Sequence, residues 1–280
     1  MDKEIIALIN LAIKEDLGEG DHTSLACVPR NKKGKAKLFA KDKGTIAGVE
    51  LGIFIFKALD KTVEISIYKQ DGEKVKSGDT ILIVEGNEQL LLQAERLVLN
   101  FMQRMSGIAT FTNRFNQELK GLNTQLLDTR KTTPGLRKIE KWAVRIGGGT
   151  NHRMGLYDMI MLKENHIDYA GGIEPAINKT NAYLEKINKK IPIEVETRDL
   201  AELKEVLKVG GVHRIMLDNF SLTDLRIAVE LIEGNYETEA SGGINLHSVR
   251  AIAETGVDYV SVGALTHSVT SLDISMLVIE

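Results

Sequence analysis

Short apolar runs and amphipathic helical stretches alternate through the second half of the chain. After Gly107 each apolar run ends in a polar residue or a glycine, as in L-L-D-T-R-K, M-I-M-L-K-E-N-H, I-P-I-E-V-E-T, I-M-L-D-N, Y-E-T-E-A-S-G-G and V-S-V-G-A-L. The stretches between the later runs, at 200–208, 222–232 and 246–255, have helical periodicity. Such alternation is typical of βα units around a parallel sheet. Six or seven strands of this kind predict an α/β barrel, complete or incomplete.

The first half of the chain has shorter and more varied elements. An apolar stripe from Ile5 to Ile13 predicts an N-terminal helix, and residues 15–24 are expected to form a loop. Alternating strands are predicted at 36–40, 44–48, 63–68 and 80–85, followed by a long helix at 88–105. This half therefore predicts an α+β domain that is separate from the βα repeats.

Composition narrows the class of protein. The chain has 280 residues, 43% of them hydrophobic, which is enough for one large domain or two ordinary ones. The formal net charge of -3 gives no reason to expect nucleic acid or an anionic membrane as a partner. Cys27 is the single cysteine, which excludes an internal disulfide and a zinc site of several thiolates. We see no signal sequence or bilayer-length apolar run, and we expect a cytoplasmic protein.

Residues 128–153 are strongly cationic although the whole chain has a net charge of only -3: this segment has seven arginines and lysines and two acids. Apolar residues at helical spacing behind Pro134 predict a helix within it. The cations on that helix can be explained as a solvated face. The pairs Arg130-Lys131 and His152-Arg153 flank the helix and could converge on one small anion, because guanidinium groups bind carboxylate and phosphate through paired hydrogen bonds.

Polar residues and glycines also follow the predicted barrel strands, where catalytic groups of such barrels lie. These residues are Arg130, Lys131, Lys163, Glu196, Asp218, Ser241 and Gly263. The last two strands end in Ser241-Gly242-Gly243 and Val262-Gly263-Ala264, and glycine there lets a phosphate approach backbone N–H groups. A glycine that ends a strand can also be only a turn residue.

The residues that follow the predicted strands form the expected mouth of the barrel, and they include both cations and acids. Its four cations are expected to bind anionic groups: Arg130, Lys131, Arg153 and Lys163. Glu196 and Asp218 are candidates for binding a divalent cation or sugar hydroxyls. The alternative for these acids is a buried ion pair with Lys163 or Lys131.

The histidines divide into two groups. His152 and His166 are candidates for acid–base groups or for supporting hydrogen bonds. The others are expected to be structural: His22, His213, His247 and His267. The sequence has no H-E-x-x-H motif, no P-loop, no dinucleotide fingerprint after a strand and no nucleophile elbow.

Eight ordered motifs carry a family resemblance. They are R-M-S-G-I-A-T, D-T-R-K-T-T-P-G-L-R, G-G-G-T-N-H-R, L-K-E-N-H, E-V-E-T, I-M-L-D-N, A-S-G-G-I and V-G-A-L-T-H-S. In this order they resemble the quinolinate phosphoribosyltransferase (decarboxylating) family, also called nicotinate-nucleotide pyrophosphorylase. The resemblance implies an N-terminal α/β sandwich domain, residues 1–108, and an open α/β barrel, residues 109–266. Residues 267–280 are expected to pack back on the first domain.

The resemblance also implies a reaction. Quinolinate and 5-phosphoribosyl 1-pyrophosphate would give nicotinate mononucleotide, pyrophosphate and carbon dioxide with Mg2+. The resemblance further implies a homodimer in which an arginine, here Arg96, would reach the neighbouring active site. Glu164 stands where the family more often has aspartate.

The site residues implied by the resemblance fall into overlapping groups. Substrate-binding residues would be Arg96, Thr129, Arg130, Lys131, His152, Arg153, Lys163, Glu196, Asp218, Ser241, Gly242, Gly243, Val262, Gly263 and Ala264. Catalytic residues would be Lys131, Lys163, Glu196 and Asp218. Glu196 and Asp218 would also bind Mg2+, directly or through water or substrate.

Three other functions are considered. A paralogue of the same fold, linked to molybdenum transport, would not require the complete set of cations in T-R-K, H-R and L-K-E-N-H. Another sugar-phosphate barrel enzyme, or a non-catalytic phosphosugar-binding protein, would keep the glycine loops without a site for a dianion. The complete set of cations favours the quinolinate enzyme.

Overall fold

The computed structural model describes all 280 residues, which form two compact units. Unit 1 comprises Met1–Asn113, Thr133–Gly148 and Leu265–Glu280, and unit 2 comprises Arg114–Thr132 and Gly149–Ala264. The helix α4 (Glu88–Glu118) continues from the first unit into the second. Residues 133–148, which the sequence analysis groups with the barrel, belong to unit 1.

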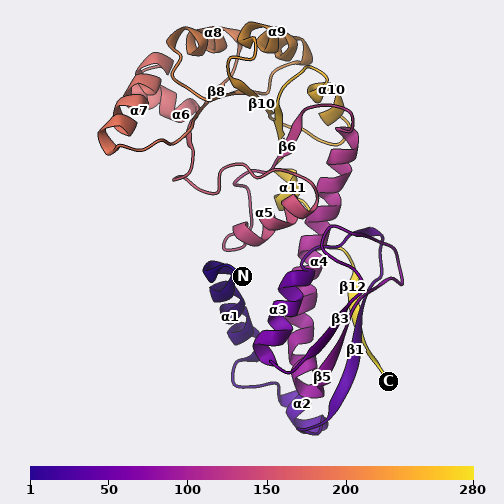
Figure 1. Ribbon diagram of the computed structural model, residues 1–280. Helices are drawn as coiled ribbons and strands as arrows, with labels where there is room; N and C mark the ends of the chain where they lie inside the picture. The colour runs from indigo at the N-terminus through magenta and orange to yellow at the C-terminus, as the bar shows by residue number, and fades with distance from the viewer. The chain divides into compact units, whose positions relative to one another are not determined.

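Unit 1 is built on a four-stranded antiparallel sheet with the strand order β12-β1-β5-β3 (Figure 1). Its strands are β1 (Lys33–Ala40), β3 (Glu64–Ile67), β5 (Thr80–Asn87) and β12 (Ile274–Ile279). A second, two-stranded sheet joins β2 (Gly44–Thr45) to β4 (Lys74–Val75). In the larger sheet β12 pairs with β1 from Lys35↔Ile279 to Ala40↔Ile274, so a late segment of the chain completes a sheet begun by an early one.

The helices of unit 1 are α1 (Lys3–Leu17), α2 (His22–Cys27), α3 (Val49–Leu59), the first part of α4, and α5 (Arg137–Ile146). Figure 1 shows α3 and α4 side by side along the sheet. Gly52 makes this close approach possible, because a Cβ there would lie 3.0 Å from the sulfur of Met102 and 3.2 Å from Val98. The short helix α11 (Ala264–His267) leads back from the barrel strands into this unit.

Unit 2 contains a six-stranded parallel sheet with the order β6-β11-β10-β9-β8-β7. The strands are β6 (Gln125–Leu127), β7 (Ile160–Leu162), β8 (Ile193–Thr197), β9 (Arg214–Asp218), β10 (Glu237–Ser241) and β11 (Tyr259–Ser261). The connecting helices are α6 (Glu164–Ala170), α7 (Ile173–Ile187), α8 (Leu200–Val209), α9 (Leu222–Ile232) and α10 (Val249–Ala253). β6 and β7 form the two edges and do not pair with each other, so the predicted open α/β barrel is confirmed.

Two local predictions were wrong. Residues 15–24 are not one loop, because Asp21 caps α2 by accepting from the backbone N–H of Ser24 at 3.1 Å. The helix expected to end at 105 continues to Glu118 through Gly107. That glycine is needed for packing: a Cβ would lie 2.3 Å from the carbonyl oxygen of Thr270. None of the helices combines the length and the apolar character that a membrane span needs.

Candidate active site

The carboxyl ends of the six parallel strands bring the predicted polar residues of unit 2 to one edge of the barrel. Lys163 follows β7, Glu196 lies near the end of β8, and Asp218 ends β9. Ser241 ends β10 and Val262 follows β11. Because parallel strands end at the same edge, these side chains come from neighbouring strands of one mouth.

The first pair at this mouth is an ion pair. Lys163 Nζ lies 2.5 Å from Glu196 Oε2, with the lysine side chain 46% exposed and the glutamate 13% exposed. The ion-pair alternative considered for Glu196 is therefore observed. It also compensates the desolvation of a carboxylate at the end of a buried strand.

The second pair joins β9 to β10. The hydroxyl of Ser241 donates to Oδ1 of Asp218, and the Asn219 side chain donates to Oδ2 of Asp218 at 2.7 Å. Gly242 (φ 97°) follows directly, and a Cβ there would lie 2.1 Å from Asn219 Oδ1. Glycine is therefore required at 242 by the approach of Asn219. At Gly243 (φ 59°) no atom lies within 4 Å of the Cβ position, so space is open there.

The two flanking cationic pairs are brought together by Asp128, which is fully buried at the end of β6. Its Oδ1 accepts from the backbone N–H of His152 at 2.8 Å, and its Oδ2 accepts from the Asn151 side chain. Burial lowers the pKa of Arg153, and the positive charge of Arg130 lowers it further. An anion bound at these two arginines would reduce their mutual repulsion.

The neighbouring turn after β11 lies against the same strand. The N–H of Val262 donates to the carbonyl of Leu127 at 3.0 Å, and Leu127 directly precedes the loop from Asp128 to Arg130. The Val262–Ala264 turn and the Arg130 loop are thus adjacent at the mouth. Thr129 Oγ1 accepts from the N–H of Lys131 at 3.0 Å and shapes this loop.

Sequence reasoning missed a buried cluster of charges beneath the mouth. His152 Nε2 lies 3.0 Å from Glu194 Oε2 and 3.1 Å from Glu239 Oε2. Glu239 Oε2 also accepts from Arg214 at 3.1 Å, and the guanidinium of Arg214 lies 4.1 Å from the ring centre of Tyr259. The sequence did offer a signal: Glu194 and Glu239 are charged residues inside apolar strands. They lie two residues before Glu196 and Ser241, respectively.

This cluster retains a proton near neutral pH. Burial works to lower the pKa of His152, but the hydrogen bonds and charges of Glu194 and Glu239 outweigh it and raise that pKa to about 9. Burial and the charge of Glu239 raise the pKa of Glu194 to about 7. The backbone N–H of Arg153 donates to His152 Nδ1 at 2.6 Å, which leaves Nε2 as the ring nitrogen that shares the retained proton with Glu194 and Glu239. The three groups titrate together, so the proton belongs to the cluster.

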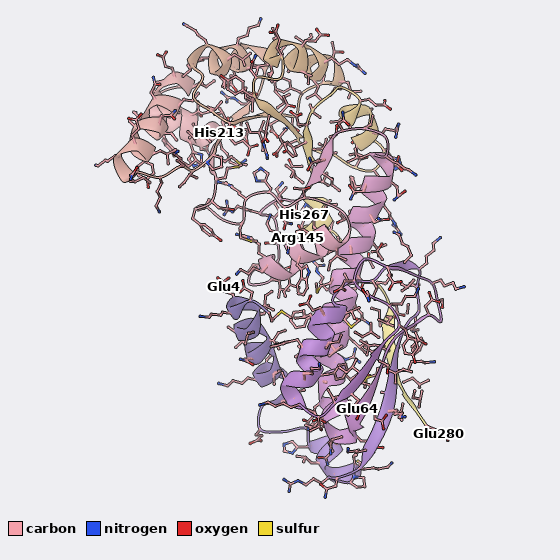
Figure 2. The ribbon with its side chains drawn as sticks, viewed as in Figure 1. Glu4, Glu64, Arg145, His213, His267 and Glu280 are labelled. Carbon is pink, nitrogen blue, oxygen red and sulfur yellow. The ribbon has the colours of Figure 1, made fainter.

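The candidate His166 and the histidine His213, which is expected to be structural, both have structural partners. His166 accepts from the backbone N–H of Lys163 through Nδ1 at 3.1 Å, which completes the cap of α6. His213, labelled in Figure 2, accepts from the N–H of Ile193 at 3.0 Å at the amino ends of the strands. Glu164 pairs with Arg198 at 3.0 Å, which gives the side chain at this unusual position a partner. Arg96 lies exposed on α4 in unit 1.

Two arrangements could bind a metal ion. His152, Glu194 and Glu239 have ligand atoms that all lie within 4.8 Å of one another. Glu196 and Asp218 belong to no such group of three, so a cation held by them would need oxygen ligands from water or substrate. Mg2+ is commonly held in that way, by one or two carboxylates and substrate phosphates.

Comparison with known proteins divides the chain into two consecutive segments near residue 107. Residues 21–106 match the quinolinate phosphoribosyl transferase N-terminal domain, and residues 108–277 match the C-terminal domain of that family. The chain is 46% identical over 288 residues to a chloroplastic nicotinate-nucleotide pyrophosphorylase [carboxylating] of Oryza sativa, covering 98% of this chain and 77% of that one. It is 44% identical over 269 residues to a probable nicotinate-nucleotide pyrophosphorylase [carboxylating] of Bacillus subtilis, covering 96% and 91%.

Solved structures agree. The crystal structure of NadC from Streptococcus pyogenes superposes with a TM-score of 0.93 at 38% identity, covering 99% of this chain and 98% of that one. The nicotinate-nucleotide pyrophosphorylase of Francisella tularensis superposes with a TM-score of 0.92, also at 38% identity, covering 99% and 96%. The resemblance seen in the sequence motifs is confirmed, and the chain belongs to the quinolinate phosphoribosyltransferase family.

Proposed function

We propose that this protein transfers the phosphoribosyl group of 5-phosphoribosyl 1-pyrophosphate to quinolinate with loss of carbon dioxide, giving nicotinate mononucleotide for NAD biosynthesis. The observation that carries the proposal, beside family membership, is that Asp128 ties the segment of Arg153 to the loop that carries Arg130, so that the charge of Arg130 lowers the pKa of Arg153. A ring that bears two carboxylates matches this pair of repelling cations.

Quinolinate would lie against the cations of the mouth. Arg130 and Arg153 would each bind a carboxylate through paired hydrogen bonds. Lys131 and Lys163 would supply point charges, and Lys163 could exchange part of its contact with Glu196 for a contact with substrate. Thr129 would keep the Arg130 loop in shape through its contact with the N–H of Lys131.

The phosphoribosyl donor would lie beside it. Its 5-phosphate would bind to backbone N–H groups of the two turns formed by Ser241, Gly242, Gly243 and by Val262, Gly263, Ala264. The open space at Gly243 supports this placement. Glu196 and Asp218 would accept hydrogen bonds from the ribose hydroxyls.

A divalent cation fits these acids. Asp218 and Glu196 come from adjacent strands, and together with phosphate oxygens and water they form the donor set that Mg2+ prefers. When bound, Mg2+ would neutralise the charge of the departing pyrophosphate. Binding to Mg2+ would compete with Lys163 for Glu196 and with Ser241 for Asp218.

The rate of the reaction would depend on how the two substrates are aligned and on the charged side chains around them. Departure of pyrophosphate leaves positive charge on the ribose, and the carboxylates of Glu196 and Asp218 would stabilise it. The pyridine nitrogen attacks C1 of the sugar with its lone pair as the bond to pyrophosphate breaks. The 2-carboxylate then leaves as carbon dioxide, the electron pair of the broken bond stays on the ring carbon, where the adjacent positive nitrogen stabilises it, and that carbon takes up a proton. Alignment by Arg130, Arg153 and Lys131 would account for much of the rate.

We further propose a homodimer in which Arg96 enters the active site of the partner subunit. Its support is the family resemblance, which implies this role for Arg96, and the exposure of Arg96 on α4. A cytoplasmic location is also proposed, since Cys27 alone cannot form an internal disulfide.

The decisive experiment incubates the purified protein with quinolinate labelled in the 2-carboxylate, the pyrophosphate donor and Mg2+. Release of labelled carbon dioxide in equal amount with nicotinate mononucleotide is expected. Nicotinate, which lacks the 2-carboxylate, serves as the matched control substrate and should react far more slowly. Absence of both products from quinolinate would reject the function, and equal use of nicotinate would reject the dianion site.

A further inference from the structure

Two segments of the mouth begin side by side. The quinolinate loop, residues 128–132, follows β6 and carries two of the cations proposed to bind quinolinate, and the phosphate turn, residues 262–264, follows β11. The two strands are paired, with Leu127 opposite Ser261, and the N–H of Val262 donates to the carbonyl of Leu127 at 3.0 Å. The sheet therefore fixes the starting points of both segments relative to each other.

The far ends of the two segments meet at one ion pair. Thr133 follows the quinolinate loop directly, and Thr266, in α11, lies two residues after the phosphate turn (Figure 1). Both residues contact the pair formed by Arg104 of α4 and Glu140 of α5, in which Nη2 of the arginine lies 2.7 Å from Oε1 of the glutamate. All four residues belong to unit 1.

Each member of this pair holds the end of one segment. Oε2 of Glu140 accepts from the backbone N–H of Thr133 at 3.1 Å, and its Oε1 accepts from the hydroxyl of the same threonine at 2.8 Å. Nη2 of Arg104 donates to the carbonyl of Thr266 at 2.5 Å, and Nη1 donates to the carbonyl of Val269 at 3.4 Å. A single guanidinium therefore joins the ends of both segments through one carboxylate.

The burial of the pair indicates what it contributes. The side chain of Glu140 is fully buried, and that of Arg104 is 26% exposed. Because desolvation offsets most of the attraction in such a pair, well-packed apolar residues often stabilise a fold as well as a buried ion pair does. Stability alone therefore gives little reason for these charges. The planar guanidinium, in contrast, fixes the directions of a carboxylate and a carbonyl at the same time.

Resting on the proposed function, we propose that Arg104 and Glu140 are positioning residues, which fix the ends of the quinolinate loop and the phosphate turn at one spacing. This spacing would set the distance between the pyridine nitrogen and C1 of the ribose. Thr129 and Lys131 keep the local shape of the quinolinate loop without the pair, so each substrate alone should still bind. The pair would control the alignment of the two substrates, in which an error of about 1 Å can lower the rate about 100-fold.

A direct contact between Arg104 and an anionic substrate is the competing role. Nε and Nη2 of Arg104 both donate to Glu140, at 3.1 and 2.7 Å, and Nη2 also donates to the carbonyl of Thr266. A substrate anion would have to displace a fully buried carboxylate, which would then lose its compensating charge. The arrangement therefore favours the positioning role.

The test uses Glu140→Gln and Arg104→Lys in the full-length protein, with Arg250→Lys as the matched control. Arg250 also joins a glutamate, Glu254 at 3.0 Å, to a backbone carbonyl, that of Glu118 at 2.8 Å, and neither partner belongs to the two segments. We expect both test variants to lower kcat by about tenfold or more. The Kd of quinolinate and the Kd of the pyrophosphate donor, each measured alone by calorimetry, should stay within about threefold.

The control should change none of these values. An unchanged kcat in both test variants would overturn the positioning role. A Kd that rises by as much as kcat falls would also overturn it, because that result would assign Arg104 or Glu140 to direct binding of a substrate.

A neutral double variant separates positioning from stability. Arg104→Met combined with Glu140→Gln leaves no unpaired buried charge, so its urea midpoint should recover part of the loss seen in Arg104→Met alone. Its kcat should stay low, because no group then joins Thr133 to Thr266. If kcat recovers together with the midpoint, the pair is only structural and the proposal is overturned. A stoichiometry of one quinolinate per chain shows that a variant is folded, and the double variant replaces a single variant that fails to fold.

The proposed function and the positioning role fail in different ways. If the wild-type protein does not convert quinolinate, the proposed function is rejected and the positioning role falls with it. If the wild-type protein converts quinolinate and the test variants behave like Arg250→Lys, only the positioning role is rejected.

Discussion

The backbone N–H of His152 donates to the buried carboxylate of Asp128 at 2.8 Å. Through this hydrogen bond the segment that carries Arg153 is tied to the end of β6, next to Arg130. Two cations that are distant in sequence are thereby held close together although they repel each other. The stability of this arrangement should depend on the acid that holds it.

Replacing Asp128 by alanine is therefore expected to cost both stability and substrate binding. Its carboxylate accepts two hydrogen bonds in a fully buried position, and loss of such an acceptor costs on the order of 2 to 4 kcal/mol. Urea unfolding and the KM for quinolinate measure the two effects. Asp199→Ala, which removes the exposed cap of α8, is the control, with a loss of about 1 kcal/mol in stability and unchanged kinetics. Normal quinolinate kinetics in Asp128→Ala would contradict the anchoring role.

Arg130→Ala should weaken quinolinate binding by about 2 kcal/mol or more, the scale of a desolvated charged hydrogen bond. Calorimetry with quinolinate alone measures this directly. Arg226→Ala on the exposed surface of α9 changes the net charge by the same amount and should leave binding unchanged. Equal affinities of the Arg130 and Arg226 variants would remove Arg130 from the site.

A shared active site makes a prediction for mixtures. Arg96→Ala and Lys163→Ala are each expected to be nearly inactive. Exchange of subunits would create dimers with one intact site, and about a quarter of wild-type activity should return in an equal mixture. Mixing each variant with itself is the control. If no mixture gains activity although subunits exchange, Arg96 does not act across the dimer.

The raised pKa of His152 predicts how stability changes with pH. The proton that His152 shares with Glu194 and Glu239 is held more tightly in the fold, where the pKa of His152 is raised from 6.5 to about 9, so the stability it contributes is complete below pH 6.5 and is lost as pH rises through 9. The charged groups that face it are Glu194 and Glu239, with Arg214 behind them. Between pH 6.5 and about pH 10, wild type should lose stability relative to His152→Gln, by at most about 1.4 kcal/mol per pH unit. Parallel urea-unfolding profiles of the two proteins would contradict the shift.

Gly242 and Gly243 should differ in their tolerance of alanine. At Gly242 the new Cβ would lie 2.1 Å from Asn219 Oδ1, whereas at Gly243 only the positive φ of 59° opposes it. We expect a loss of roughly 1 kcal/mol for Gly243→Ala and a clearly larger one for Gly242→Ala. Thermal unfolding compares them, and equal losses would show that Asn219 moves aside without cost.

Much of the barrel could be predicted from sequence, because its strands are short apolar runs at regular spacing and its polar residues follow them. Lys163, Glu196 and Asp218 lie where that rule places them. Glu194 and Glu239 could not be found by the same rule, since they lie inside strands and depend on partners from other parts of the chain. The end of α4 was predicted wrongly for a related reason. Gly107 is typical of a helix end, but here a glycine is needed because the backbone of Thr270 packs against it.

The pairing of β12 with β1 has a consequence for biosynthesis. A ribosome makes β1 early and β12 only after every barrel strand has emerged, so the edge of β1 that will receive β12 stays open throughout that interval. Exposed strand edges of this kind invite association with other nascent chains. Chaperone protection during translation should therefore matter most for β1, and a stalled chain that lacks β12 should aggregate through it.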